Sequence, residues 1–159
     1  MKFTDYILKD AILPELKATD QQGVIREMVQ SLVDAGGIEK EAYEEIVKAI
    51  IKRESLGTTG IGHGVAIPHT RHPSVKRHVG TVAISAEGID FDDFYDEKTQ
   101  LFFMVLSPTP DDTSGHVHIM GELTGRLGKD DTLRESLKQA KTQEAIFALL
   151  EEDDSNEKR

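Results

Sequence analysis

The segment "TQLFFMVLS", residues 99–107, restricts the fold of this chain more than any other part of the sequence. Apolar residues follow one another from Leu101 to Leu106, without the alternation that marks a strand with one exposed face. This pattern is typical of a central strand that is covered on both faces. Two shorter segments, "GVAIPH" and "VGTVAISA", are rich in small or β-branched apolar residues and lie between turn-forming residues, which predicts further strands.

Helical patterns precede and follow these strands in the sequence. Apolar pairs recur every four residues after Thr19 and Asp20, either of which can cap a helix, and they stop at the glycine pair 36–37. Residues 39–54 carry a similar stripe. Three further helices are expected over residues 116–128, 131–140 and 142–152. This order of elements indicates an α/β or α+β domain in which helices cover a sheet.

The length of 159 residues, with 38% apolar and 30% charged residues, fits a single domain with its own core. We predict one domain over residues 1–151. The remaining run, "EDDSNEKR" at residues 152–159, is polar throughout and carries a net negative charge, and it predicts an acidic, disordered and solvated tail.

Composition also limits the classes of function. Cysteine is absent, which excludes a thiol nucleophile and a thiolate metal site. The net charge of −10 opposes sequence-independent binding to nucleic acid. The N-terminus carries charges throughout, and no apolar run approaches the roughly 18 residues of a membrane span, so we expect a cytoplasmic protein without membrane insertion.

Six histidines are the main candidates for chemistry near neutral pH. A metal site is one hypothesis, because His69 and His72 are three residues apart and His116 and His118 are two apart. Residues two apart on a helix point in different directions, and the proline after His72 disfavours a helix there. Neither spacing is a strong metal signature, and we predict no metal site.

The glycine-rich stretch "GTTGIGHGVAIPHT", residues 57–70, allows two other interpretations. A nucleotide-binding loop needs a strand before it and a helix after it, and neither pattern is present. The alternative is a phosphorylated histidine. Pro68 limits the freedom of the chain just before His69, the preceding apolar residues supply a rigid strand, and Arg53 and His118 are candidate donors to a phosphoryl group.

The stretch "RESLGTTGIGHGVAIPHT" closely resembles the phosphorylation-site signature of the type 2 IIA domains of the phosphoenolpyruvate-dependent phosphotransferase system. These domains include fructose- and mannitol-type sugar IIA domains and stand-alone nitrogen-regulatory IIA proteins. The similarity extends over nearly the whole chain, with "HVHIMGELTGRL" at the expected later position. It implies a mixed β-sheet flanked by helices on both faces, in three layers.

The resemblance also implies roles for individual residues. His69 is expected to be the phosphorylated residue, and to react through Nε2 of its neutral ring. The second active-site histidine of the family falls on His118, and the arginine at the helix end falls on Arg53. His116 matches a histidine that is present in some members and is a weaker candidate.

Two residues depart from the family pattern. Thr70 stands where members commonly have glycine or alanine, so its hydroxyl is a candidate contact for the phosphoryl group or a partner, together with Pro68 and Gly62. His63 occupies a position that is usually not histidine, and we favour an incidental exposed side chain there.

By this resemblance the protein would accept a phosphoryl group from HPr or an HPr-like carrier and pass it to a IIB domain, as a phosphotransferase component that needs no cofactor. The alternative is a purely regulatory binding module that acts on a regulatory protein through its phosphorylation state. A histidine metal-site protein is a distant third hypothesis.

Overall fold

The computed structural model describes residues 1–92, 94–110 and 113–156. Two long helices, α2 (Gln21–Asp34) and α3 (Tyr43–Ser55), come first, and Asp20 caps α2 by accepting a hydrogen bond from the Gly23 amide. Helices α4 (Thr113–Lys129), α5 (Asp131–Gln139) and α6 (Gln143–Asn156) follow the strands. The short helices are α1 (Phe3–Tyr6), η1 (Lys9–Ala11) and η2 (Lys40–Ala42).

The strands form one mixed sheet built around β5. The strands are β1 (Gly60–Gly62), β2 (Val65–Ala66), β3 (His69–His72), β4 (Val79–Ile89) and β5 (Thr99–Pro108). Strands β2 and β3 pair in parallel with β5, whereas β4 pairs antiparallel with it. Strand β5 is therefore the interior strand that the apolar run predicts.

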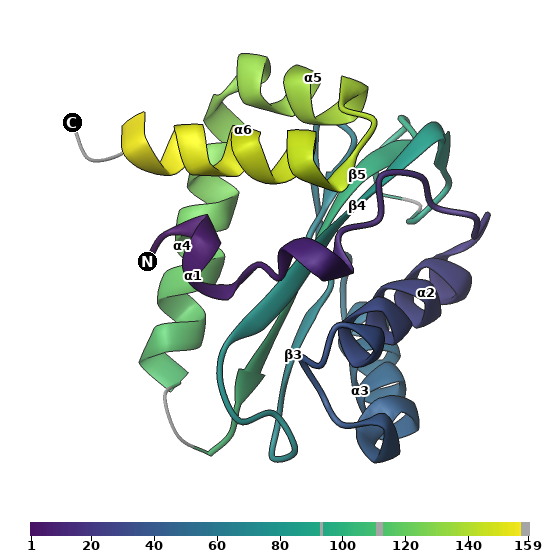
Figure 1. Cartoon of the computed structure of the whole chain (residues 1–159). Coiled ribbons are helices and arrows are strands. Elements are labelled where there is room, and N and C mark those ends of the chain that lie inside the picture. The colour runs from purple at the N-terminus through teal and green to yellow at the C-terminus, as the bar shows by residue number, and fades with distance from the viewer. Residues whose placement is uncertain (93, 111–112, 157–159) are drawn as a thin grey trace.

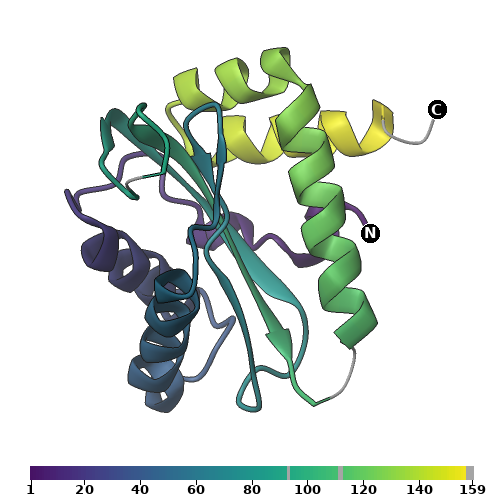
Figure 2. The same cartoon turned by 180° about the vertical axis from the view of Figure 1, so that it is seen from behind.

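Helices cover both faces of this sheet, as Figures 1 and 2 show. Phe102, Met104 and Leu106 of β5 belong to a core shared with α2 and α3. Leu101, Phe103 and Val105 belong to a second core, shared with α4, α5 and α6. Successive side chains of a strand point to opposite faces, so the unbroken apolar run fills both cores. The predicted three-layer α/β fold, a mixed sheet flanked by helices, is confirmed.

Pro68 lies between β2 and β3, which follow the same side of β5. A proline has no amide hydrogen to donate, but its carbonyl still accepts a hydrogen bond from the Val105 amide (3.1 Å). The chain therefore stays hydrogen-bonded to β5 at Pro68, between β2 and β3. His69 comes next and pairs with Val105, close to the end of the sheet where β5 leads to α4.

The C-terminal residues correct one expectation. Residues 152–156 are the last part of α6, and Asp154 is only 4% exposed. Its carboxylate accepts hydrogen bonds from the amides of Phe3 (2.8 Å) and Thr4 (3.1 Å) and from the guanidinium of Arg126 (3.0 Å). The prediction of a disordered tail is wrong for residues 152–156, because this acidic turn anchors the N-terminal segment; residues 157–159 lie outside the described part.

Candidate functional site

His69 begins β3 and is held by a short hydrogen bond to its own chain. Its Nδ1 atom lies 2.8 Å from the carbonyl oxygen of Ile67. A carbonyl oxygen only accepts, so Nδ1 must carry the proton and donate it. In the neutral ring, Nε2 then keeps an unprotonated lone pair, which makes it the nucleophilic atom of the side chain.

The surroundings of His69 favour this neutral form. Burial lowers the pKa of His69 below its ordinary value, and the positive charge of Arg53 lowers it further, against the opposing effect of the hydrogen bond to Ile67. At neutral pH the ring is therefore uncharged. A neutral ring with a free Nε2 lone pair is what an attack on phosphorus requires.

Arg53 lies in the last turn of α3 and lines the same pocket as His69. Its guanidinium donates to the carbonyl oxygen of Gly57 (2.9 Å), which ties it to the turn that follows the helix. The neighbouring Glu54 is buried and accepts hydrogen bonds from the amide (2.7 Å) and hydroxyl (2.6 Å) of Thr59. These bonds fix the chain between α3 and β1 and so position Arg53.

Sequence reasoning did not assign this role to Glu54, although a signal was present. Glu54 follows Ile46, Val47 and Ile50 on the buried stripe of α3. An acidic residue at a core position of a helix needs donors, because burial raises its pKa, as it does for Glu54. The position of Glu54 on the stripe therefore predicts an anchored carboxylate.

His116 is the histidine that lies beside His69. The two ring centroids are 5.5 Å apart, with the rings tilted by 43°. His116 is 8% exposed, and burial together with the positive charges of nearby groups lowers its pKa to about 4. Both rings are therefore neutral near pH 7, and both line one pocket.

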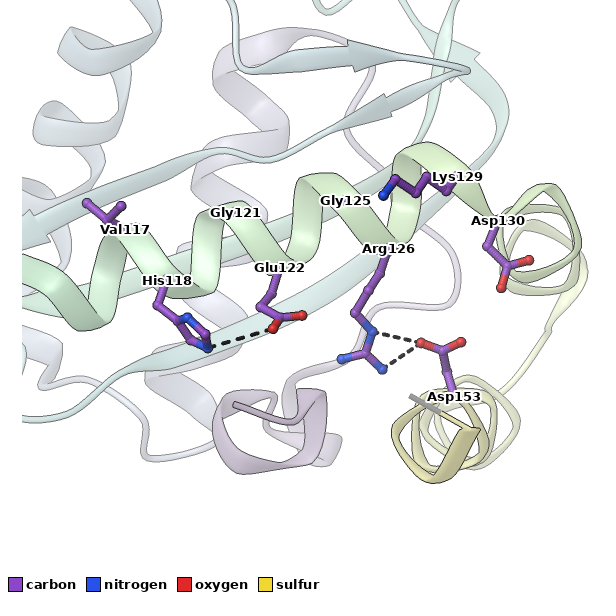
Figure 3. A pocket seen from close by; sticks show the side chains of 9 residues that line it. All are labelled: Val117, His118, Gly121, Glu122, Gly125, Arg126, Lys129, Asp130 and Asp153. Atoms are coloured by element: carbon purple, nitrogen blue, oxygen red, sulfur yellow. Dashed lines mark hydrogen bonds and ion pairs between the residues drawn. The ribbon is translucent and has the colours of Figure 1, made fainter. Parts of the chain in front are cut away.

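His118 does not occupy the place that the sequence predicted for it. Its side chain is 55% exposed and its Nε2 atom lies 3.8 Å from the carboxylate of Glu122, one turn further along α4. Figure 3 shows it in a different groove, along the helix from the ion pair of Arg126 and Asp153. Two residues advance a helix by more than half a turn, so His116 and His118 point in different directions. The weaker candidate, His116, is the one that meets His69.

The pocket around His69 has a volume of about 390 Å³. Its lining combines residues from α3, β3, the segment directly after β5 and α4: Arg53, His69, Thr70, Arg71, Thr109 and His116. Arg71 was not predicted from the sequence. It is two residues after His69 on β3, and residues two apart on a strand share a face, so the strand pattern contains the signal.

The other predicted contact residues differ in their positions. Thr70 lines the pocket, and Pro68 is buried directly before His69. Gly62 has a φ of +85° at the end of β1 and lies against the ring of Tyr95, away from this lining. His63 is exposed with a φ of +59°, and its carbonyl accepts a hydrogen bond from Lys138.

Among residues 1–92, 94–110 and 113–156, no group of three or more side chains of the kinds that bind metals comes together. Within the same residues, no helix is both long enough and apolar enough to cross a membrane.

Comparison with known proteins agrees with the fold. Residues 5–153 match the family model described as phosphoenolpyruvate-dependent sugar phosphotransferase system, EIIA 2. A nitrogen regulatory protein of Bradyrhizobium diazoefficiens is 30% identical over 94% of this chain and 95% of its own. The fructose-specific EIIA component of Haloferax volcanii is 34% identical over 88% of each chain.

A solved structure shares the fold as well. The nitrogen regulatory protein IIA-Ntr of Neisseria meningitidis superposes with a TM-score of 0.79, at 27% identity, over 92% of this chain and 97% of its own. The mixed sheet between two helical layers is therefore common to this chain and that nitrogen regulatory protein. This chain belongs to the type 2 EIIA family of the phosphoenolpyruvate-dependent phosphotransferase system.

Proposed function

We propose that this protein is a phosphocarrier that accepts a phosphoryl group on Nε2 of His69 from the phosphohistidine of HPr or an HPr-like carrier. The observation that carries the proposal is the hydrogen bond from Nδ1 of His69 to the carbonyl of Ile67 (2.8 Å). It holds the proton on Nδ1 and leaves Nε2 as the nucleophile.

The transfer needs an in-line approach more than covalent chemistry from the protein. The Nε2 lone pair of His69 forms a new P–N bond while the P–N bond in the donor breaks and its electron pair returns to the donor's ring. Because His69 already carries its only proton on Nδ1, Nε2 has no proton to lose before it attacks. In the second transfer, an acceptor atom forms a new bond to phosphorus while the P–N bond to His69 breaks and its electron pair returns to Nε2.

The lining of the pocket contains groups that can stabilise the negative charge of the transferred phosphoryl group. The guanidinium groups of Arg53 and Arg71 are permanent cations beside His69, and His116 brings a second imidazole to the same pocket. Charge-assisted hydrogen bonds to phosphoryl oxygens are among the stronger polar contacts in proteins. Thr70 lines the pocket too, so its hydroxyl is a further proposed contact.

Partner docking would place this pocket against another protein. Two large apolar side chains are exposed on the segments that supply the site: Leu56, directly after α3, is 78% exposed, and Val117 on α4 is 63% exposed and lines the other groove, with His118. Exposed apolar side chains can supply the apolar part of a protein interface, which is surrounded by a polar rim. They fit an HPr-type donor and a IIB domain that use the same surface in turn.

The decisive experiment is phosphorylation in vitro with phosphoenolpyruvate, enzyme I and HPr, followed by intact-protein mass spectrometry. The wild type should gain the mass of one phosphoryl group, and His69→Ala should gain none. His72→Ala is the matched control, because His72 lies on the same strand but contacts Ser74 and Glu45 rather than the pocket. Unchanged phosphorylation of His69→Ala would overturn the proposal.

A purely regulatory role is a second candidate, favoured by the similarity to a nitrogen regulatory protein over 95% of that protein's length. The two functions differ in the step after phosphorylation. Incubation of the phosphorylated protein with purified IIB domains distinguishes them: onward transfer supports a sugar phosphocarrier, and retention of the phosphoryl group supports regulation of a protein target. We propose no nucleic acid ligand and no cofactor for either role.

A further inference from the structure

A second histidine lies behind His116 and is connected to it through one serine. The hydroxyl oxygen of Ser107 is 2.7 Å from Nδ1 of His116 and 2.8 Å from Nδ1 of His78. Ser107 is on β5 and fully buried, His116 is on α4, and His78 directly precedes β4. Three elements of the fold therefore converge on one hydroxyl group next to the pocket.

The chemistry of a hydroxyl restricts how these contacts are made. Ser107 has one hydrogen to donate and can accept at its oxygen, so it can donate to only one of the two rings. In one arrangement, His78 donates to the oxygen and the hydroxyl donates to Nδ1 of His116. In the reverse arrangement, His116 donates from Nδ1 and its Nε2 atom has no proton.

We propose that Ser107 is a positioning residue that donates its hydroxyl hydrogen to Nδ1 of His116, and thereby holds the proton of that ring on Nε2. His78 completes the chain by donating from its own Nδ1 to the Ser107 oxygen, which fixes the direction of the hydroxyl. The inference rests on the proposed phosphocarrier function, because it gives His116 the donor that a phosphoryl oxygen needs.

The need for a hydrogen-bond donor to the phosphoryl group favours this arrangement over its reverse. His69 carries its proton on Nδ1 and presents a bare Nε2 lone pair. If His116 were also bare at Nε2, two lone pairs would meet an anionic phosphoryl group with no imidazole hydrogen between them. With Ser107 donating to Nδ1, the two rings are complementary, so one is the nucleophile and the other is the donor.

The charge state of His116 makes the position of its proton important. A protonated imidazole donates from both nitrogens, but a neutral one has a single N–H. Burial and the positive charge of Arg71 lower the pKa of His116, so its ring is neutral near pH 7, and protonation of His69 or His78 would lower that pKa further. In a neutral ring, the hydrogen bond made by one nitrogen decides which nitrogen carries the proton.

The first test is long-range ¹H–¹⁵N NMR of the unphosphorylated protein, with no carrier present. His116 in the wild type should show a protonated, pyrrole-type Nε2 and an unprotonated, pyridine-type Nδ1. Ser107→Ala should show averaged shifts from both tautomers. Protonation of Nδ1 in the wild type would overturn the proposal, and this result does not depend on whether the protein can be phosphorylated.

The second test is the rate of phosphoryl transfer from the phosphorylated carrier. Ser107→Ala should slow it about tenfold, the effect of losing one buried hydrogen bond, and Ser107→Thr, which keeps the hydroxyl, should restore most of the rate. Ser74→Ala is the matched control, because it removes a hydroxyl bonded to His72, a histidine outside the pocket lining. Equal rates for Ser107→Ala and Ser74→Ala would overturn the proposal.

These tests separate the proposal from the function on which it rests. If the wild type accepts no phosphoryl group, the phosphocarrier function fails, while the NMR measurement still decides the tautomer. If Ser107→Ala does not fold, the tautomer of the wild-type protein decides the proposal alone.

Discussion

His69 and His116 meet across the boundary between β3 and α4, with their ring centroids 5.5 Å apart and each ring anchored through its Nδ1 atom. The anchors differ in kind. Ile67 offers a carbonyl that only accepts, whereas Ser107 offers a hydroxyl that can also donate. A backbone carbonyl therefore fixes the proton of His69 on Nδ1, whereas His116 is hydrogen-bonded to a side-chain hydroxyl.

This anchoring predicts which nitrogen of His69 is phosphorylated. Nδ1 is occupied by the bond to the Ile67 carbonyl, so the phosphoryl group should be on Nε2 alone. Heteronuclear NMR of the ¹⁵N-labelled phosphoprotein should show phosphorus coupling to Nε2. Coupling to Nδ1 would mean that the hydrogen bond to Ile67 is broken during transfer, and that the ring position described here is not the reactive one.

The two histidines of α4 should differ sharply in their effect on phosphoryl transfer. His116→Ala removes the imidazole next to His69 and should slow acceptance of the phosphoryl group by roughly 10- to 100-fold. His118→Ala removes an exposed side chain from another groove and should leave the rate within about twofold of the wild type. Stopped-flow or quenched-flow transfer from the phosphorylated carrier measures both. The reverse order would restore His118 to the site.

Much of the fold follows from local patterns in the sequence. The unbroken apolar run 101–106 predicts an interior strand, and the periodic stripes on either side of it predict the helices that cover both faces. Pro68 followed by His69 after a buried strand predicts a rigidly held histidine, and the structure has one. These features depend on neighbouring residues, which a sequence shows directly.

The helical features that the sequence analysis missed or misplaced have one thing in common: each is a polar residue on the apolar stripe of its helix. Glu54 follows Ile50, Asp154 follows Leu150, and His116 precedes Ile119 on the buried faces of their helices. Treating charge as a sign of exposure places Asp154 in a solvated tail, and spacing alone does not separate His116 from His118. The helix phase separates them, but the partners of each polar group come from distant segments that no local pattern identifies.

The buried neutral His116 predicts a loss of stability in acid. Its pKa is about 4 in the folded protein, below the ordinary value of about 6.5, so the unfolded chain binds a proton first as the pH falls. The free energy of unfolding should therefore decrease between pH 6.5 and pH 4, by up to about 3 kcal/mol from this residue. Urea denaturation at a series of pH values measures it.

The control for this prediction is the difference between variants, because other groups titrate in the same range. Burial raises the pKa of Glu54, which acts in the opposite direction by favouring the protonated folded state. His116→Gln should lose the acid-dependent component, and His118→Gln, on the same helix but exposed, should keep the wild-type slope. Parallel slopes for the wild type and His116→Gln would show that His116 titrates equally in both states.

The final turn of α6 should contribute strongly to stability despite its acidic sequence. Asp154→Ala removes the acceptor of the Phe3 and Thr4 amides and a carboxylate that pairs with buried Arg126. Unpaired buried donors and a partly uncompensated charge should lower the free energy of unfolding by about 3 kcal/mol. Glu152→Ala, an exposed acid on the same helix, should change it by less than about 0.5 kcal/mol. Equal midpoints in urea for the two variants would show that this turn is not the anchor of the N-terminal segment.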